Sequence, residues 1–462
     1  MALSDRQLDL LLLLVAQAGQ VVPKAALLDT AWPDVAVGDN SLEQAISGLR
    51  RALGRPPTGT TYVETLARRG YRLGVPVTRS VARHTDQALE SLLAPYRAFV
   101  EGRAALETLT SGAVARARGV FEEMVHFAPD FAPGHVGLAN ALAFGFEAAR
   151  ADDTPDAAAL LTAVHHAREA CRLDANYGEA WATLAFVLSP GGSADAAAAG
   201  RRAVTLEPDN WRHQARLAYV TWGEERLRAA RRALALLPGF GLAHWLAATV
   251  HVARQAFDEA ERELVVGTAA QDQGASDGRF GSVGLHLLLG LLLFTRGDEA
   301  GAVRELRREL EFEQTGHIYA REACANSWSA LGAMHLGGGD TVQAVADFQQ
   351  ALERVPNHSL ALAAVATLSG GDAGRAASIR LEQRLALFEA YGLSFDAAMT
   401  RGASQALAGR HDEAAALVHA ALQAAPVGTG AGWRLPVDPF FQTTRHAADW
   451  QAALATLRHR AA

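Results

Sequence analysis

Residues 40–54 read NSLEQAISGLRRALG, and this stretch decides the fold of the N-terminal part of the chain. At 100° per residue, four apolar side chains fall within roughly 60° of one another and predict a buried helical stripe: Leu42, Ile46, Leu49 and Leu53. The opposite face carries non-acidic polar groups able to read base edges in a DNA major groove: Asn40, Gln44, Ser47 and Arg51. Many surface helices show a polar face, so the pattern alone leaves a solvated face open as an alternative.

The sequence around this helix supplies the rest of a small domain. Ser4 and Gln7 have the spacing of a capping box and open an apolar stretch that continues to Val15. A second helix is predicted over about residues 24–32, ended by Pro33, and the third over 40–53, ended by Gly54. Residues 61–66 and 71–75 alternate as strands around a turn at 67–70. Three helices followed by a hairpin form the winged-helix plan.

Three strings carry a resemblance to a known family: LSDRQLDLLLLLVAQAGQVVPKAALLDTAWPD (3–34), NSLEQAISGLRRALG (40–54) and YVETLARRGYRL (62–73). In order and spacing they resemble the OmpR/PhoB-type winged-helix DNA-binding domain of bacterial transcription regulators. The resemblance covers about residues 3–75. It implies that helix 40–53 is the recognition helix and that Trp32 belongs to the core.

The same resemblance implies DNA-contacting residues at matching positions. Groove-facing side chains would be Asn40, Gln44, Ser47 and Arg51, phosphate contacts would be Arg50, Arg55 and Arg72, and the wing would carry Arg68 and Arg69 toward the minor groove. For Arg68 and Arg69 a merely solvated hairpin tip is the alternative.

Two features depart from the family pattern. Family members normally have a small antiparallel sheet before the first helix, whereas Leu3 already adjoins the first helix here. Either the start codon is misassigned or the domain is trimmed, and a trimmed domain would bind DNA less strongly. In addition, Asn40 with Glu43 three residues later predicts a helix N-cap, and a capping side chain is less free to read bases.

The remaining chain is mostly α-helical in pattern. Residues 76–89 are predicted to be a linker, 90–432 an α-solenoid of tetratricopeptide (TPR) repeats, and 433–462 a C-terminal cap with a helix from about Ala447. The clearest repeat follows the 34-residue pattern, with Trp328, Leu331, Gly332, His335, Gly339, Ala344, Phe348, Ala351 and Pro356. Weaker copies bring the expected number to roughly eight to ten, with insertions such as residues 149–156. Such an array presents a groove able to hold a protein or peptide.

Charge and cysteine content narrow the functional class. Residues 1–80 carry nine Lys/Arg and seven Asp/Glu, a net charge of +2. Because the whole chain has a net charge of −7, the remaining residues carry −9. This asymmetry permits a nucleic-acid-binding module at the N-terminus. Two distant cysteines, Cys171 and Cys324, predict buried thiols in a reducing compartment. No stretch is long enough to span a membrane, and a cytoplasmic protein is expected.

The motifs of common enzymes are missing from the sequence. All sixteen histidines lie beyond residue 80, and the best cluster is His165, His166 and Glu169. With no second pair at metal-ligand spacing, we expect this cluster to be a solvated helix face and His335 to be a packing residue. No Walker loop, GxSxG, GxGxxG or paired CxxC motif occurs. The prediction is a protein without catalytic residues, metal or cofactor.

Two functional hypotheses follow. In the first, the chain is a sequence-specific transcription regulator: the winged helix binds double-stranded promoter DNA, and the solenoid senses a protein, peptide or small effector. The solenoid would hold the winged helix away from DNA or pair two copies over adjacent half-sites. In the second, it is a TPR scaffold whose winged helix no longer binds DNA. The operator, the effector, the sign of regulation and the oligomeric state stay open.

Overall fold

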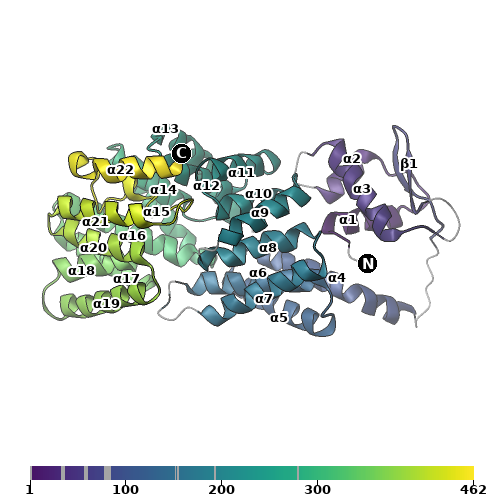
Figure 1. Ribbon diagram of the computed structural model, residues 1–462, viewed down its shortest axis with the longest axis horizontal. Helices are drawn as coiled ribbons and strands as arrows, with labels where there is room; N and C mark the ends of the chain where they lie inside the picture. Colours follow the sequence, from purple (N-terminus) through teal and green to yellow (C-terminus); the bar gives the residue numbers. More distant parts are fainter. Residues whose placement is uncertain are drawn as a thin grey trace.

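The computed structural model describes residues 3–32, 37–56, 61–77, 85–150, 152, 156–191, 194–277 and 280–462. Within these ranges a small domain of three helices and a two-stranded sheet precedes a long array of α-helices. Figure 1 shows this domain at one end of the elongated molecule, beside the first helices of the array. The predicted fold class, a winged helix followed by an α-solenoid, is confirmed.

The N-terminal domain comprises α1 (Asp5–Ala16), α2 (Lys24–Ala31), α3 (Asp39–Leu53) and the hairpin β1 (Val63–Leu66) and β2 (Gly70–Leu73). The predicted capping box is present, because the Ser4 N–H donates to Gln7 Oε1 (3.0 Å) and the Gln7 N–H donates to Ser4 Oγ. The hairpin is antiparallel, with Val63 opposite Leu73. Val22 and Tyr71 exchange both backbone hydrogen bonds, which ties the segment before α2 to the sheet.

This domain has a hydrophobic core of its own. Its buried members all lie between Leu3 and Leu73, and they include Trp32, which is 4% exposed, and three of the four predicted stripe residues of α3. The fourth, Leu53, is half-buried and packs against this core. The larger ones are Leu10, Leu14, Leu27, Trp32, Leu42, Ile46, Leu49 and Tyr71. Because these side chains pack on one another, the domain can bury its apolar surface without the array.

In the described part of the array, successive helices pair from α4 with α5 to α20 with α21, and α22 follows. These nine pairs fall within the predicted number. The helices are α4 (Thr85–Glu107), α5 (Ser111–Phe127), α6 (Ala132–Ala149), α7 (Ala157–Leu173), α8 (Gly178–Leu188), α9 (Ala194–Leu206), α10 (Trp211–Val220), α11 (Gly223–Leu236), α12 (Gly241–Ala253), α13 (Phe257–Asp277), α14 (Leu285–Thr295), α15 (Glu299–Glu311), α16 (Ala320–Gly337), α17 (Thr341–Arg354), α18 (Ser359–Leu368), α19 (Gly371–Ala390), α20 (Ser394–Leu407), α21 (His411–Ala424) and α22 (Ala447–Ala461).

The pair α16–α17 shows why the TPR pattern needs small residues. Phe348 of α17 is fully buried, and its ring lies where a side chain on Gly332 of α16 would be: a Cβ there would meet the ring at 2.8 Å. Gly339 has a φ of +87° in the turn, a conformation that other L-residues rarely adopt. Asp340 caps α17 by accepting from the Gln343 N–H at 3.0 Å. The pattern therefore encodes both the close packing and the turn.

The C-terminal segment turns back along the array instead of covering its last pair alone. A short 3-10 helix (Leu435–Val437) contacts α12 and α14, and the rings of Trp433 and Trp245 meet edge to face at 5.4 Å. Helix α22 packs on α21 and also on α11 and α12. The Arg254 guanidinium donates to the Ala461 carbonyl at 2.7 Å. These contacts join the end of the chain to α11, α12 and α14 in the middle of the array.

Some predicted boundaries differ from the structure. Helix α4 begins at Thr85, so the last part of the predicted linker is helical; residues 85–87 (TDQ) are polar, and polar residues favour the first turn of a helix as much as a loop. Residues 78–84 of that linker, Pro33, and 151 and 153–155 of the predicted insertion lie outside the described residues.

Both cysteines are buried free thiols, as predicted. Burial raises the pKa of Cys171 and of Cys324 to about 12, so neither is a thiolate at neutral pH. Among the helices that the structure describes, none combines the length and the apolar character needed to cross a membrane.

Candidate nucleic-acid interface

Helix α3 presents the polar face that the sequence predicts. Gln44, Ser47 and Arg51 are exposed on the side opposite the buried Leu42, Ile46 and Leu49. The helix begins at Asp39, with Gly38 as its N-cap, so the prediction that Asn40 is the cap is wrong. A glycine cap and an acidic residue in the first turn satisfy the helix start here without a side-chain cap from Asn40. Asn40 is exposed on the same side as Gln44.

The position of α3 is set by its contact with α1. A Cβ built on Gly48 would lie 2.2 Å from Nε2 of Gln7, the same side chain that completes the capping box of α1. The missing side chain at Gly48 therefore permits the two helices to approach closely. The capping box thus helps to place the recognition-type helix as well as to start α1.

Two of the predicted phosphate-contacting arginines have partners inside the domain. Arg50 donates to the Val63 carbonyl (2.8 Å) and to Thr65 Oγ1 (2.6 Å), which links α3 to the hairpin. Arg72 forms an ion pair across the hairpin with Glu64, at 2.6 Å. Arg50 therefore holds the hairpin against α3, and Arg72 joins the two strands of the hairpin.

The other predicted cations are exposed. Arg68 and Arg69 lie at the hairpin tip, where Arg68 has a φ of +61°, and Arg55 follows the end of α3. Within the described residues, Arg51, Arg55, Arg68 and Arg69 form no ion pair. Four cations on the helix–hairpin side of the domain are consequently without an ion pair among the described residues.

A family model matches this part of the chain. Residues 1–73 match the domain described as "Transcriptional regulatory protein, C terminal". The N-terminal domain is an OmpR/PhoB-type winged helix. In Salmonella typhimurium, the transcriptional regulator HilA is 39% identical to this winged helix over 72 residues, which are 16% of this chain and 13% of HilA. The transcriptional activator CadC of Escherichia coli is 33% identical over 78 residues, or 17% of this chain and 15% of CadC. The match therefore spans a small part of either relative.

Two solved structures are similar to part of this chain at low sequence identity. The human IFIT1 dimer with m7Gppp-AAAA covers 74% of this chain with 76% of its own, at 15% identity and a TM-score of 0.47. The Cut9–Hcn1 hetero-tetramer of the APC/C covers 74% of this chain with 59% of its own, at 13% identity and a TM-score of 0.44.

The winged helix docks against the acidic loops of the first repeats. Ser41 Oγ of α3 donates to Asp209 at 2.8 Å, and Asp209 also pairs with Arg232. The Ser41 hydrogen bond lowers the pKa of Asp209, which keeps this carboxylate ionised. On α1, Asp5 pairs with Arg103 of α4. Sequence reasoning missed these contacts, because their partners are about 100 or more residues apart.

Arg6 is a largely buried cation of the docked surface. Burial lowers the pKa of its guanidinium, and the nearby carboxylates of Glu207, Glu179 and Asp209 oppose that shift. The guanidinium carbon also lies 5.2 Å from the centroid of the Trp32 ring. Arg6 therefore places a positive charge of the winged helix among the acids of the solenoid.

A cavity of about 550 Å³ separates the winged helix from the solenoid beside this contact. Gln44, Gly48 and Arg51 line it from α3, while Asp174, Glu207 and Asp209 line it from the loops of the array. Asn40 and Ser47 are not part of its wall. Two of the four predicted groove-reading residues thus border a cavity whose opposite wall is acidic.

Histidines and buried acids of the solenoid have structural partners. Glu169 pairs with Arg172, and His335 is half-exposed and pairs with buried Asp347 at 2.6 Å, so His335 is not simply a packing residue. His166 faces His135 at 2.9 Å between Nδ1 atoms, and burial lowers its pKa to about 4. No group of three or more His, Cys, Asp or Glu side chains suited to a metal ion occurs in the ranges described.

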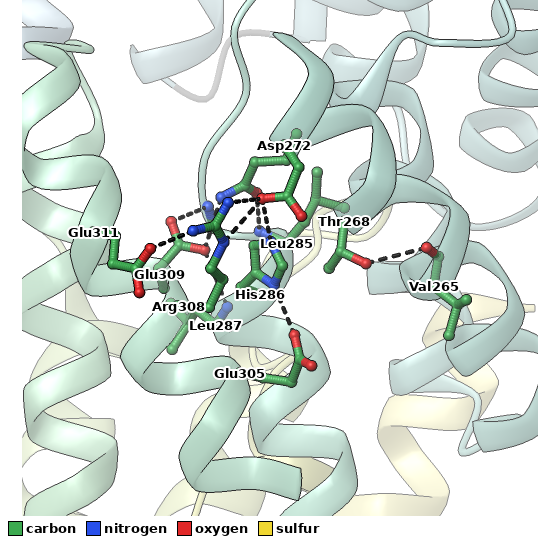
Figure 2. Close-up of polar contacts among 12 residues, drawn as sticks. Val265, Thr268, Asp272, Leu285, His286, Leu287, Glu305, Arg308, Glu309 and Glu311 are labelled. Carbon is green, nitrogen blue, oxygen red and sulfur yellow. Dashed lines mark hydrogen bonds and ion pairs between the residues drawn. The ribbon is translucent and has the colours of Figure 1, made fainter. Parts of the chain in front are cut away.

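The most deeply buried carboxylate, Glu309, holds the start of a helix. It accepts from the backbone N–H of Gly284 (2.7 Å) and of Leu287 (3.2 Å), and from the Gln271 amide. Figure 2 shows Glu309 at the first turn of α14, with Arg308 and His286 nearby. Burial raises the pKa of Glu309, and these hydrogen bonds oppose the shift. Its lone pairs are used to satisfy helix N–H groups.

Proposed function

We propose that the chain is a sequence-specific DNA-binding transcription regulator. Helix α3 would enter the major groove with Asn40, Gln44, Ser47 and Arg51 toward the base edges. Arg68 and Arg69 would reach the minor groove from the hairpin, and Arg50, Arg55 and Arg72 would lie near phosphates. The observation that carries the proposal is the set of exposed arginines on this side, four of which have no acidic partner in the described structure.

The docked arrangement would keep the domain from binding DNA. A helix in the major groove is flanked by phosphates on both sides. Here the carboxylates of Asp174, Glu207 and Asp209 occupy the wall opposite Gln44 and Arg51. Phosphates entering that space would meet like charges within the Debye length of about 8 Å. DNA binding therefore requires the winged helix to leave the solenoid.

The solenoid would set the balance between the docked and released forms by binding an effector. A ligand shifts such an equilibrium only if it binds one form more tightly than the other. The TPR groove suits a protein, peptide or small effector. Release would also allow two copies to occupy adjacent half-sites as a homodimer on promoter DNA, in the cytoplasm.

The test compares the full chain with residues 1–80, which contain a complete hydrophobic core. Fluorescence anisotropy would measure binding to fragmented genomic DNA from the source over a salt series. We expect the fragment to bind with a log–log salt slope of about −3 to −4, as four unpaired arginines that displace counterions from the DNA imply, and the full chain to bind more weakly. If neither binds while circular dichroism shows a folded fragment, the scaffold function replaces this proposal.

A further inference from the structure

A cavity of about 190 Å³ lies within the first half of the solenoid, among α6, α8 and α10. Its wall is largely aromatic, with contributions from Phe144, Phe186, Trp211, Tyr219 and Tyr319. A second cavity of about 420 Å³ adjoins it and shares Leu109, Tyr219, Leu242 and Tyr319. Aromatic cavities of this kind are typical of sites for small organic molecules.

One cation in this wall, Arg216, forms no ion pair with the residues that the structure describes. The Arg216 guanidinium lies 3.7 Å from the centroid of Phe186 and 5.4 Å from that of Phe144. Its Nη2 donates to the neutral amide oxygen of Asn140 at 3.1 Å. In the described part of the chain it forms no other hydrogen bond and no ion pair. Burial lowers its pKa, yet a guanidinium has five N–H donors and remains protonated in proteins.

A second buried arginine in the same region provides the contrast. Arg226 donates to the carbonyls of Ala218, Tyr219 and Thr221 and to Thr249 Oγ1. Its N–H groups are therefore used by the backbone between α10 and α11 and by Thr249. Arg216 faces the cavity with most of its donors unused by the described residues, which is the arrangement expected for binding a ligand rather than for supporting a fold.

The other charges around the cavity have partners within the chain. Three arginines line it, Arg103, Arg212 and Arg216, against the two glutamates Glu107 and Glu179. Arg212 pairs with Glu107, and Arg103 pairs with Asp5 of the winged helix. Glu179 accepts from His213 at 3.2 Å. Glu179 and Glu147 lie near Arg216 and oppose the lowering of its pKa by burial, but neither forms an ion pair or hydrogen bond with it among the described residues.

We propose that this cavity binds a small organic acid, with its carboxylate paired to Arg216 and a flat apolar body among Phe144, Phe186 and Trp211. A buried cation is stabilised by a bidentate carboxylate, and an aromatic wall favours a planar body. The volume suits one or two fused rings rather than a polymer.

The position of the cavity connects the ligand to the winged helix, and this step rests on the proposed function. Arg103, Glu107 and Arg212 line this cavity and also the cavity of about 270 Å³ between the solenoid and α1. An acid bound at Arg216 alters the charge balance around Arg103, which holds Asp5 of α1. Ligand binding and docking are therefore coupled through shared side chains.

Isothermal titration calorimetry of the full chain tests the site without DNA. The probes are 2-naphthoate and indole-3-acetate, each compared with its neutral amide. We expect both acids to bind at least about tenfold more tightly than their amides, because the amides lack the charge that Arg216 pairs with. Arg216→Met should remove this preference, whereas Arg202→Met, at an exposed position of α9, should retain it. Acids that bind no more tightly than amides overturn the proposal.

A second variant guards against a folding defect in Arg216→Met. Leu242→Trp leaves the cation in place and fills the space shared by the two cavities. We expect it to lose acid binding while circular dichroism and melting stay near the unmodified chain. Retained binding in this variant contradicts the assigned cavity. Anisotropy with and without 2-naphthoate then tests the coupling: acid binding in a chain that binds no DNA refutes the proposed function and leaves the site standing.

Discussion

The arginines of the winged helix and those of the solenoid are used in different ways. In the solenoid many are paired within the chain, such as Arg201 with Glu225 (2.7 Å) and Arg296 with Asp258 (2.6 Å). On the helix–hairpin side of the winged helix, Arg51 and Arg68 are exposed and form no ion pair within the described ranges. Paired charges at a surface contribute little to stability, whereas unpaired ones remain available to a partner.

Paired arginines therefore support the fold, whereas unpaired arginines are free to bind a partner. The same difference also bears on Arg216 of the solenoid, which is buried, forms no ion pair with the described residues and, unlike Arg226, donates only one hydrogen bond. This criterion asks whether an arginine forms an ion pair. It does not depend on how many arginines the chain contains, because arginines occur throughout the sequence. The experiments below test whether the two classes behave differently.

The largest effect is expected from removing the unpaired cations. Arg51→Ala combined with Arg68→Ala and Arg69→Ala should weaken DNA binding by residues 1–80 at least about 100-fold and flatten the log–log salt slope by about 2 to 3, because three phosphate-proximal charges are lost. Anisotropy over a salt series measures both. A matched triple substitution of solenoid arginines, at Arg201, Arg296 and Arg308 in the full chain, should leave the salt slope unchanged. If the salt slope were unchanged in the winged-helix variant as well, unpaired and paired arginines would not differ in their contribution to DNA binding.

The second prediction concerns acid stability, since residues 1–80 contain no histidine. Burial, helped by Arg434, lowers the pKa of His358 to about 3, and burial lowers that of His317 to about 4. Below the ordinary value near 6.5 the unfolded chain binds these protons and the folded chain does not, so stability falls with pH from about 7 toward 4. We expect a loss of roughly 1 to 2 kcal/mol per site by pH 5.

Thermal melting at pH 7 and pH 5 measures this loss. His358 caps α18 by accepting from the Ala361 N–H at 3.2 Å. His358→Asn retains a capping oxygen but cannot take up a proton, so it should lose less stability between the two pH values. Residues 1–80 should melt almost alike at both. A fragment as acid-sensitive as the full chain would contradict the assignment to the solenoid.

A smaller effect is expected from releasing the docked domain. Asp209→Lys removes the acceptor of the Ser41 hydrogen bond and places a cation beside Arg232. The full chain should then bind DNA about tenfold more tightly, since a hydrogen bond to a charged group contributes on the order of 1.5 kcal/mol. Glu353→Lys, at an exposed position of α17, makes the same change in net charge far from the contact. If both variants gain equally, net charge rather than docking is responsible.

The smallest effect is expected at Arg72, which is paired with Glu64 in the hairpin. Because a paired cation attracts phosphate less than an unpaired one, Arg72→Ala should weaken DNA binding by only about twofold to threefold. The single substitution Arg51→Ala in the same fragment is the reference and should have the larger effect. A loss at Arg72 as large as at Arg51 would show that pairing within the domain does not predict DNA contact.

Local signals predicted the winged helix and the repeats well. The capping box of Ser4 and Gln7, the stripe of α3 and the spacing from Trp328 to Phe348 each depend on residues close in sequence, and each is present in the structure. The start of α3 was misjudged because Gly38, Asp39 and Asn40 all favour helix N-termini. Which of the three becomes the N-cap of α3 depends on the direction from which the preceding loop enters the helix.

Long-range contacts could not be predicted in this way. The Ser41–Asp209 hydrogen bond joins segments 168 residues apart, and its formation depends on the accumulated turn of several repeats. The sequence indicates the cavity at Arg216 only weakly. Aromatic and basic residues lie on one side of a helix there: Trp211, Arg212, Arg216 and Tyr219. Nothing in that spacing reveals that Phe144 and Phe186, from two earlier helices, enclose the guanidinium.

The return of α22 onto α11 and α12 has a consequence for how the protein is made. Residues Trp222, Leu227, Trp450 and Leu457 belong to one hydrophobic core. A ribosome adding 5 to 20 residues per second would need on the order of 10 to 40 s to pass from α12 to the end of α22. During that time the apolar side of α11 lacks its last partner. The nascent chain is therefore expected to depend on chaperones until synthesis of α22 is complete.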